Sequence, residues 1–272
     1  MNKARGCFIF FIIVALIVSI FIFIFISSGS SDSTNYLFLG IDEEGEKGEF
    51  KGRTDTIIIF SINTDKKTAL ISVPRDTRVN LEGHGFSKIN AAYVYGGTQM
   101  TKNEIFKLTG LEIYKTMLVD FEGFMNIVDV LGGVTIKIDE PLHDPFSGAD
   151  FDPGTYTFNG SQALSFARCR STSAGDFDRM DRQKYLLSEL FRQRANIAII
   201  PKIPDIIDLL EKETKSDFNI YDYFKISIAL MKNRENLNLL TLPGQSQTID
   251  KISYVIIDEV QAKNYILENL KK

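Results

Sequence analysis

The hydrophobic positions in the first third of the chain form short apolar runs that are separated by polar turns. Runs of this length, rich in β-branched and aromatic residues, are typical of strands that are buried on both faces of a sheet. The polar turn at residues 63–67 is short enough to join its two neighbours as a hairpin. The pattern predicts strands at residues 36–41, 56–62, 68–73, 114–121, 134–138 and 238–242.

Between these runs, apolar residues recur at the spacing of amphipathic helices. Gly110 follows one such segment and Gly132-Gly133 follows another, as glycine commonly does where a helix ends. Residues 141–160 contain prolines and glycines without periodicity, so we expect a long surface loop with one short hairpin. Helices are predicted at residues 88–93, 97–109, 124–131, 178–191, 202–213 and 221–232, with a short helical turn at 161–167.

Strands that alternate with helices indicate an α/β (α+β) protein. We expect residues 36–272 to form a single layered α-β-α domain with a mixed central sheet and helices on both of its faces. The chain contains no internal repeat that would indicate a different architecture.

One segment departs from the globular pattern. Phe8–Ile26 has 19 residues without a charge, about 28 Å as a helix, which is close to the hydrocarbon thickness of a bilayer. A cleaved signal peptide is the alternative, but its apolar core would be shorter and a small-residue cleavage site would follow. Lys3 and Arg5 precede the segment, so the positive-inside rule places residues 1–7 in the cytoplasm.

This topology predicts a single-pass protein of the cell membrane whose main domain lies outside the cell. Residues 27–35 are polar and rich in Gly and Ser, so we expect them to be a linker that holds the domain near the membrane. Because an external domain has no ready supply of ATP, any phosphate it handles is expected to arrive on a lipid or a secreted metabolite.

The charge of the chain excludes some partners. The chain has 272 residues, of which 44% are hydrophobic and 24% are charged. Of its 31 basic residues, Lys3 and Arg5 precede the predicted anchor, which leaves 29 against 35 acidic residues and a net charge of −6. An acidic domain lacks the broad basic surface that nucleic-acid binding needs, so no nucleic-acid partner is expected. Cys7 and Cys169 would be separated by the membrane edge, so neither a disulfide framework nor a zinc site is predicted.

Against this acidic background, residues 167–183 hold four arginines and three aspartates. Arg168 and Arg170 alternate as on an extended segment and would point to one side. A second group has helical spacing after a break at Asp176, and comprises Arg179, Arg182 and Gln183. Such a run can be a solvated helix face. However, extended arginines beside a helix N-terminus suit a polyanion, and phosphate is the expected one.

Charged residues also occur at the tips of three predicted strands, namely Asp42, Arg53 with Asp55, and Arg75 with Asp76. In α/β sheets ligands collect at strand ends, so these residues are expected to face a common ligand. Asp42 and Asp55 would hold one hard divalent ion, Mg²⁺ or Mn²⁺, which also binds phosphate oxygens. Asp76 is the alternative ligand, or it pairs with a neighbouring arginine.

An apolar group lies near the predicted sheet end and comprises Val119, Phe121, Phe124, Ile127 and Val130. Core packing is the first interpretation of this group, and a channel for a lipid tail is the second. Sequence motifs of serine hydrolases, P-loop enzymes and zinc proteases are lacking. Arginines with aspartates suit phosphoryl transfer, in which the protein positions charge.

Several motifs in register resemble the LytR-CpsA-Psr family of cell-wall glycopolymer ligases. They span nearly the whole predicted external domain and occur in the order of that family. The matching stretches are RTDTI at 53–57, SVPRDT at 72–77, KINAAY at 88–93, VDFEGF at 119–124, VDVLGGV at 128–134, GSQALSFARCRSTSAGDFDRMDRQ at 160–183 and TLPG at 241–244.

This resemblance implies an enzyme at the outer face of the membrane of a mostly Gram-positive type of cell. It would take a glycopolymer, of teichoic acid or capsular type, from an undecaprenyl-pyrophosphate carrier. It would attach this polymer by a phosphodiester to a sugar hydroxyl of peptidoglycan, so that donor, peptidoglycan and membrane are its expected partners.

The resemblance also implies roles for single residues. The residues that would hold the pyrophosphate are Arg75, Arg168, Arg170, Arg179 and Gln183, with Arg53 and Lys88 nearby. Asp176 would orient the acceptor or act as a base. Phe121 and Phe124 would help to line the polyprenyl channel.

Asp42 and Asp55 would coordinate Mg²⁺ on the same resemblance. The loop after Asp42 is long and rich in glutamates, which leaves Glu43 and Glu44 as alternative ligands.

Two other functions remain open on the sequence. A polyprenyl-pyrophosphate hydrolase would use the same site with water as the acceptor. A non-catalytic regulatory protein would bind polyprenyl phosphate without turnover, and it would not need the carboxylates that hold a metal.

Overall fold

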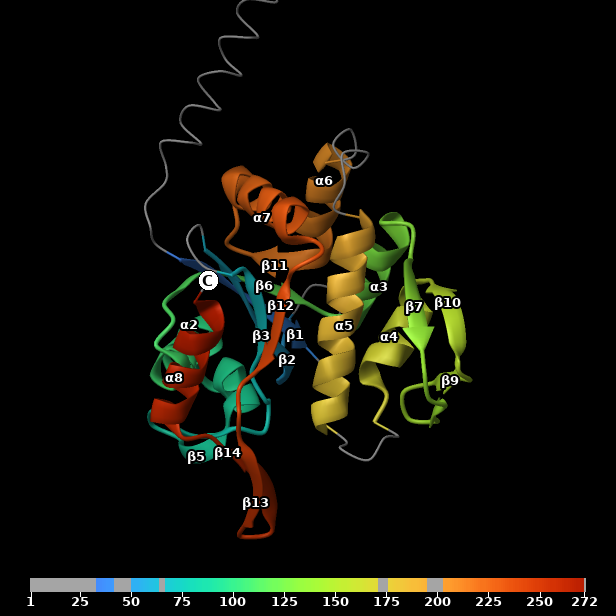
Figure 1. Ribbon diagram of the computed structural model, residues 1–272. Coiled ribbons are helices and arrows are strands. Elements are labelled where there is room, and N and C mark those ends of the chain that lie inside the picture. The colour runs from blue at the N-terminus through green and yellow to red at the C-terminus, as the bar shows by residue number, and fades with distance from the viewer. Residues whose placement is uncertain (1–32, 42–49, 64–66, 171–175, 195–202, 272) are drawn as a thin grey trace, which may run out of the picture.

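The computed structural model describes residues 33–41, 50–63, 67–170, 176–194 and 203–271 (Figure 1). The predicted cytoplasmic segment, the predicted anchor at 8–26 and the candidate ligand Asp42 lie outside these residues. Within the described ranges, no helix combines the length and the apolar character that crossing a bilayer requires.

The centre of the molecule is a six-stranded sheet with the order β11-β6-β1-β2-β3-β12. β1 is parallel to β6 and β3 is parallel to β12, whereas the other neighbours are antiparallel. The mixed central sheet is therefore confirmed, as is the hairpin of β2 and β3. Its strands are β1 (Thr34–Ile41), β2 (Thr54–Ile62), β3 (Ala69–Ser72), β6 (Ile113–Val119), β11 (Thr214–Ser216) and β12 (Asn238–Thr241).

Helices cover both faces of this sheet (Figure 1). Side chains alternate between the two faces of a strand, so consecutive residues of β1 enter different cores. Leu37 and Leu39 belong to the core beneath α2 (Ala92–Thr109) and α8 (Glu259–Leu270). Tyr36 belongs to the opposite core, with Ala229 and Leu230 of α7 (Ile220–Asn233). Burial on both faces explains why these strands are continuous apolar runs in the sequence.

The second face carries α5 (Asp176–Arg194) and α7 (Ile220–Asn233), and α5 also packs against an outer layer (Figure 1). A separate core of buried residues fills this layer. The layer comprises α3 (Phe121–Val130), α4 (Gly160–Arg168), β7 (Val134–Ile138), β10 (Gly154–Phe158) and the hairpin of β8 (Leu142–Asp144) and β9 (Ala149–Phe151), with α6 (Ile203–Glu213) against α3.

The helix ends follow from local sequence. Gly110 adopts a left-handed conformation directly after α2 (φ 70°), as the predicted helix end requires. The two helices predicted at 88–93 and 97–109 are instead a 3₁₀ turn, η1 (Ile89–Ala91), and α2, which is kinked at Gly96 and Gly97. Glycine tolerates the positive φ of 61° at Gly97 that this kink requires.

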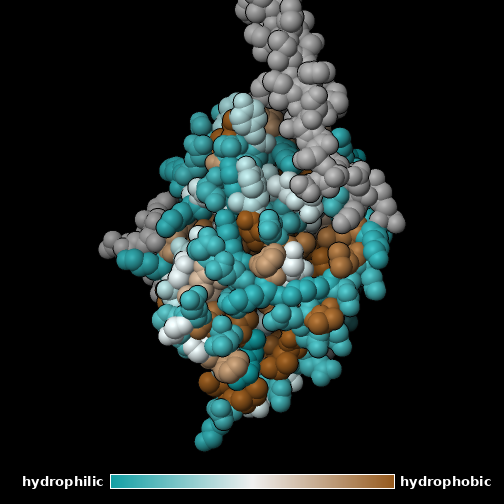
Figure 2. Space-filling model, turned by 90° about the vertical axis from the view of Figure 1, so that its left-hand side faces the viewer, coloured by the Kyte–Doolittle hydropathy of each residue, from teal (hydrophilic) through white to brown (hydrophobic). Residues whose placement is uncertain are grey.

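The structure contains elements that the hydrophobic pattern did not indicate. The predicted surface loop at 141–160 contains β10, which pairs with β7, besides the one expected hairpin. Beyond the last predicted strand, a hairpin and α8 complete the chain. The added elements are β4 (Arg78–Leu81), β5 (Gly85–Lys88), β11, β13 (Gln245–Ile249), β14 (Ile252–Ile256) and α8. Figure 2 shows the side of the molecule that bears α2 and α8, which is mainly hydrophilic with separate hydrophobic patches.

Candidate active site

Charged residues gather at one edge of the central sheet. Strands β1, β3, β6 and β12 run in the same direction and end at this edge, where β2 begins. Asp55 is near the start of β2, Arg75 follows β3, and α5 starts beside them at Asp176. The side chains of Asp55 and Arg75, both expected at strand tips, form an ion pair here; the common ligand that they were expected to face stays a prediction.

Arg75 links the sheet to α5. Its Nη1 atom contacts Oδ2 of Asp55, and its Nη2 atom lies 3.4 Å from Oδ1 of Asp176. The other carboxylate oxygen of Asp55 accepts a hydrogen bond of 3.0 Å from the amide of Asn90 in η1. Four segments of the chain, at residues 55, 75, 90 and 176, are therefore joined through two carboxylates.

Arg179 is the most buried arginine of the group, with 3% of its surface exposed. Its Nη2 atom lies 2.9 Å from Oδ1 of Asp176 and donates to the backbone oxygen of Asp55 at 3.3 Å. Burial lowers the pKa of Arg179 to about 10; Asp176 opposes this shift, while Arg75 and Arg170 add to it. The side chain still carries its charge at neutral pH, and it is poorly hydrated, which favours a strong interaction with an anion.

Arg168 and Arg170 lie at the C-terminal end of α4 and directly after it. Arg168 is the last residue of α4 and its guanidinium lies over the ring of Phe121, 4.5 Å from the centroid. The Nε atom of Arg170 lies 3.9 Å from Oδ1 of Asp176. The prediction that both arginines lie on an extended segment is wrong for Arg168. Asn159 caps the start of α4 in a capping box. The chain leaves helical geometry only at Cys169, so Arg168 is still part of the helix.

We call residues 167–170 the arginine turn, and three side chains hold its backbone. The amide of Gln183 donates to the carbonyl of Ala167 at 3.3 Å, and a guanidinium nitrogen of Arg182 donates to the carbonyl of Cys169. From the other side, the carboxylate of Asp144 accepts the backbone N–H of Arg170 at 2.8 Å.

These contacts change the interpretation of Gln183 and Arg182. Gln183 contacts the backbone next to the arginines, and Arg182 supports the same turn as a helix-surface charge. Neither Asn90 nor Asp144 was predicted to be a site residue, although Asn90 is part of the KINAAY motif. Nothing in the local sequence around Asp144 indicates its contact with Arg170, which is 26 residues away.

Other predicted site residues lie at the margin. The side chain of Arg53 is exposed, and Lys88 forms an ion pair of 2.8 Å with Asp76. Phe124 packs against the core of the outer layer, as does Val128 from the same helix. Core packing does not account for Val130, which is 51% exposed.

The group has the charge of an anion site. The guanidinium groups of Arg75, Arg170 and Arg179 face the carboxylates of Asp55 and Asp176. The Nε atoms of Arg75 and Arg179 are buried without a hydrogen-bond partner among the described residues. Buried donors of this kind are rare without a ligand or water. A phosphate oxygen would satisfy them.

The described residues contain no cluster of three or more metal-binding side chains. Asp55 has one cationic and one amide partner, and a carboxylate has about four acceptor positions, so it retains capacity for a hard cation. Ile41, the last described residue of β1, pairs with Thr54 next to Asp55. Asp55 therefore fits a magnesium site, while Asp42 lies outside the described residues.

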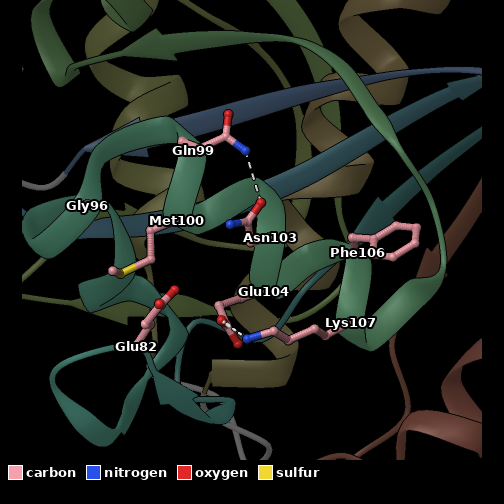
Figure 3. Close-up of a pocket in the computed structure, with 8 residues that line it drawn as sticks. All are labelled: Glu82, Gly96, Gln99, Met100, Asn103, Glu104, Phe106 and Lys107. Carbon is pink, nitrogen blue, oxygen red and sulfur yellow. Dashed lines mark hydrogen bonds and ion pairs between the residues drawn. The ribbon is translucent and has the colours of Figure 1, made fainter.

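A hollow of about 570 Å³ lies elsewhere, between α2 and the end of β4. Figure 3 shows Glu82 pointing toward Met100, with Glu104 and Lys107 paired beside them. None of the arginines of the charged group lines this hollow. The candidate active site is therefore the charged group at the sheet edge and not the hollow.

Comparison with known proteins identifies the family of the chain. The profile of the LytR_cpsA_psr family matches residues 24–272. The chain belongs to the LytR-CpsA-Psr family. Among the relatives of this family member is the polyisoprenyl-teichoic acid–peptidoglycan teichoic acid transferase TagU of Oceanobacillus iheyensis. The two are 33% identical over 236 residues, which cover 84% of this chain and 72% of the relative.

Solved structures share the fold of this LytR-CpsA-Psr protein. The crystal structure of protein gbs0355 from Streptococcus agalactiae aligns with a TM-score of 0.77 and 26% identity over 89% of each chain. The crystal structure of Bacillus subtilis TagV aligns with a TM-score of 0.75 and 27% identity, covering 89% of this chain and 98% of that one.

Proposed function

We propose that this LytR-CpsA-Psr protein is a phosphotransferase that moves a glycopolymer from a polyprenyl-pyrophosphate carrier to a sugar hydroxyl of peptidoglycan. The observation that carries the proposal is the cluster of Arg75, Arg170 and Arg179 around Asp176. The TagU relative is named as a transferase of teichoic acid to peptidoglycan, which supports the same donor and acceptor classes here.

In this proposal the arginines bind the two phosphates of the donor. The Nε–H groups of Arg75 and Arg179 are buried and have no hydrogen-bond partner among the described residues, so a phosphate oxygen that enters the group would be able to accept from them. Arg168 is stacked on Phe121 at the start of α3, and this contact supports an orientation of the donor with its lipid side toward that helix. Phe121 and Phe124 would contact the first part of the polyprenyl chain.

The acceptor hydroxyl oxygen forms a bond to the phosphorus that carries the glycan. The bond from this phosphorus to the bridging oxygen breaks, and polyprenyl phosphate leaves with the bonding electron pair. The positive charges of the arginines stabilise the negative charge that develops on the leaving phosphate. We assign the hydroxyl proton to Asp176, whose position is held by three arginines.

We further propose a magnesium ion held by Asp55 and Asp42, with Mn²⁺ as a substitute. Such an ion supplies charge neutralisation at the phosphate oxygens. Arg75 would then pair with Asp176 and with phosphate, while the hydrogen bond from Asn90 would keep Asp55 oriented.

The proposal includes a membrane anchor at residues 8–26, with the domain outside the cell. A carrier lipid would then reach the arginines from the bilayer, and peptidoglycan would reach them from the cell wall.

The decisive experiment uses the full chain in lipid vesicles with a lipid-linked glycopolymer labelled in the sugar, with and without peptidoglycan. A labelled phosphodiester on peptidoglycan is the expected product. Release of free glycopolymer phosphate at the same rate in both samples would instead identify a hydrolase. Tight binding of the donor without turnover would identify a binding protein.

A further inference from the structure

The arginine turn has two different neighbours. At one end, the guanidinium of Arg168 lies on the ring of Phe121 in α3. At the other end, the backbone of Arg170 is bound by the hairpin of β8 and β9 through Asp144. A diphosphate held by these arginines therefore has an apolar helix on one side and this hairpin on the other.

Asp144 makes the hairpin tip and the arginine turn one rigid unit. Its Oδ2 atom accepts the N–H of Arg170 at 2.8 Å, and its Oδ1 atom accepts the N–H of Phe146 at 3.0 Å. The residue is 7% exposed. Burial alone would raise the pKa of Asp144, but the N–H groups of Arg170 and Phe146 and the hydroxyl of Ser147 lower it below its ordinary value. The carboxylate is therefore charged at neutral pH and holds both backbones.

Phe146 at the tip of this hairpin is 94% exposed. A single exposed apolar side chain is common on proteins. This one differs because the carboxylate that binds its backbone N–H also binds the backbone N–H of a site arginine, so the hairpin tip that carries the ring is tied to the arginine turn. A rigid aromatic ring with an open face is a low-entropy contact for an amphipathic ligand.

We propose that Phe146 packs against the sugar ring that is attached to the diphosphate of the donor, and that Asp144 is the positioning residue that holds Phe146 and Arg170 in register. The carbon-bound hydrogens of a pyranose form an apolar face that matches a phenyl ring, while its charged phosphate lies at the arginines. The inference rests on the proposed function and adds the direction of the donor, with the lipid toward α3 and the glycan toward the β8–β9 hairpin.

The test measures binding of two probes to the detergent-solubilised full chain, undecaprenyl diphosphate and undecaprenyl diphosphate carrying one N-acetylglucosamine. We expect Phe146→Ala to weaken binding of the sugar-bearing probe by about 3- to 10-fold and to leave the bare diphosphate unchanged. Phe146→Tyr should restore the affinity. The matched control is Leu267→Ala, an apolar residue of α8 that is 53% exposed and should change neither value.

Asp144→Ala separates positioning from contact. It should weaken the binding of both probes, because the backbone of Arg170 loses its hydrogen bond to Asp144. Asp150→Asn should weaken the binding of neither probe. Asp150 lies on the same hairpin, is bound to His143 and is 90% exposed at its side chain. Equal affinity of Phe146→Ala and wild type for the sugar-bearing probe would overturn the inference. An effect of Phe146→Ala that is confined to the KM for peptidoglycan, or to the binding of vesicles made of anionic lipid, would also overturn the inference. Failure of the wild type to bind either probe would refute the proposed function itself.

Discussion

Arg179 and Asp176 lie one helical turn apart at the start of α5, with 2.9 Å between Nη2 and Oδ1. A helix N-terminus favours negative charge, and Asp176 and Asp178 occupy the first turn accordingly. A buried arginine in this place is unfavourable on its own. Its position is explained by Asp176, by the carbonyl of Asp55 and, in the proposed reaction, by phosphate.

This relationship leads to the first prediction. Arg179→Ala should lower transfer by about 100-fold or more, because a preorganised donor to the diphosphate is lost. Arg179→Lys should recover little activity, since an ammonium group cannot replace the fork of donors. The rate is measured with lipid-linked donor and peptidoglycan. Arg192→Ala is the control on the same helix, because Arg192 is exposed and pairs with Glu189 at the end of α5 that is remote from the site. A similar loss in this variant would contradict the assignment.

The second prediction concerns the metal. Asp55→Asn should abolish Mn²⁺ binding, measured by electron paramagnetic resonance of the free ion, because a neutral amide is a poor ligand for a hard cation. Asp76→Asn should keep Mn²⁺ binding, since Asp76 pairs with Lys88 instead. The opposite pattern would assign the metal to Asp76 and refute the proposed role of Asp55.

The third prediction concerns the contact of α4 with α3. A Cβ atom at Gly160 would lie 2.3 Å from the carbonyl oxygen of Met125 and 2.7 Å from its Cα atom. Gly160→Ala should therefore destabilise the fold by about 1–3 kcal/mol, because backbone has to move apart. Thermal unfolding checks this, with Ser161→Ala as the control at the next, exposed position. An unchanged melting temperature for Gly160→Ala would show that the helices separate without cost.

The fourth prediction concerns alkaline pH. The hydroxyl of Tyr36 donates to Asp222 at 3.0 Å, and burial, with the charge of Asp222, raises the pKa of Tyr36 above its ordinary value of 10.0. The folded state then keeps a proton that the unfolded chain loses, so the free energy of unfolding falls as pH rises above about 10.

Lys115 changes stability in the same direction. Burial lowers the pKa of Lys115, but its hydrogen bond to Asp222 outweighs this and raises it above 10.5. Tyr36→Phe should flatten the loss of stability above pH 10, measured by urea unfolding between pH 8 and about 11. It should also cost about 1 kcal/mol at neutral pH, where the hydrogen bond is intact. An unchanged slope would show that Tyr36 does not titrate differently in the two states.

Local sequence determined much of the fold of this LytR-CpsA-Psr protein. The apolar runs predict the strands because burial on both faces leaves only apolar positions, as in β1 and β2. Gly110 and Gly132-Gly133 predict helix ends because they adopt positive φ there. These signals involve residues within a few positions of each other, so they can be recognised without the tertiary structure.

The ordered motifs also predicted the family, and with it the set of arginines and aspartates. The sequence alone did not reveal which of them touch. Arg168 belongs to a helix and not to an extended segment. Asn90 and Asp144 bind site residues, and no sequence pattern around Asp144 predicts its contact.

Only the tertiary structure decided the contacts of the site, because they join residues that are distant in the sequence. Arg179 reaches the carbonyl of Asp55 across 124 positions, and Arg170 meets Asp144 across 26. Such pairs form when strands and helices pack with a particular register, which depends on the whole core. Periodicity predicts which face of an element is buried, whereas packing determines which charged side chains that burial brings together.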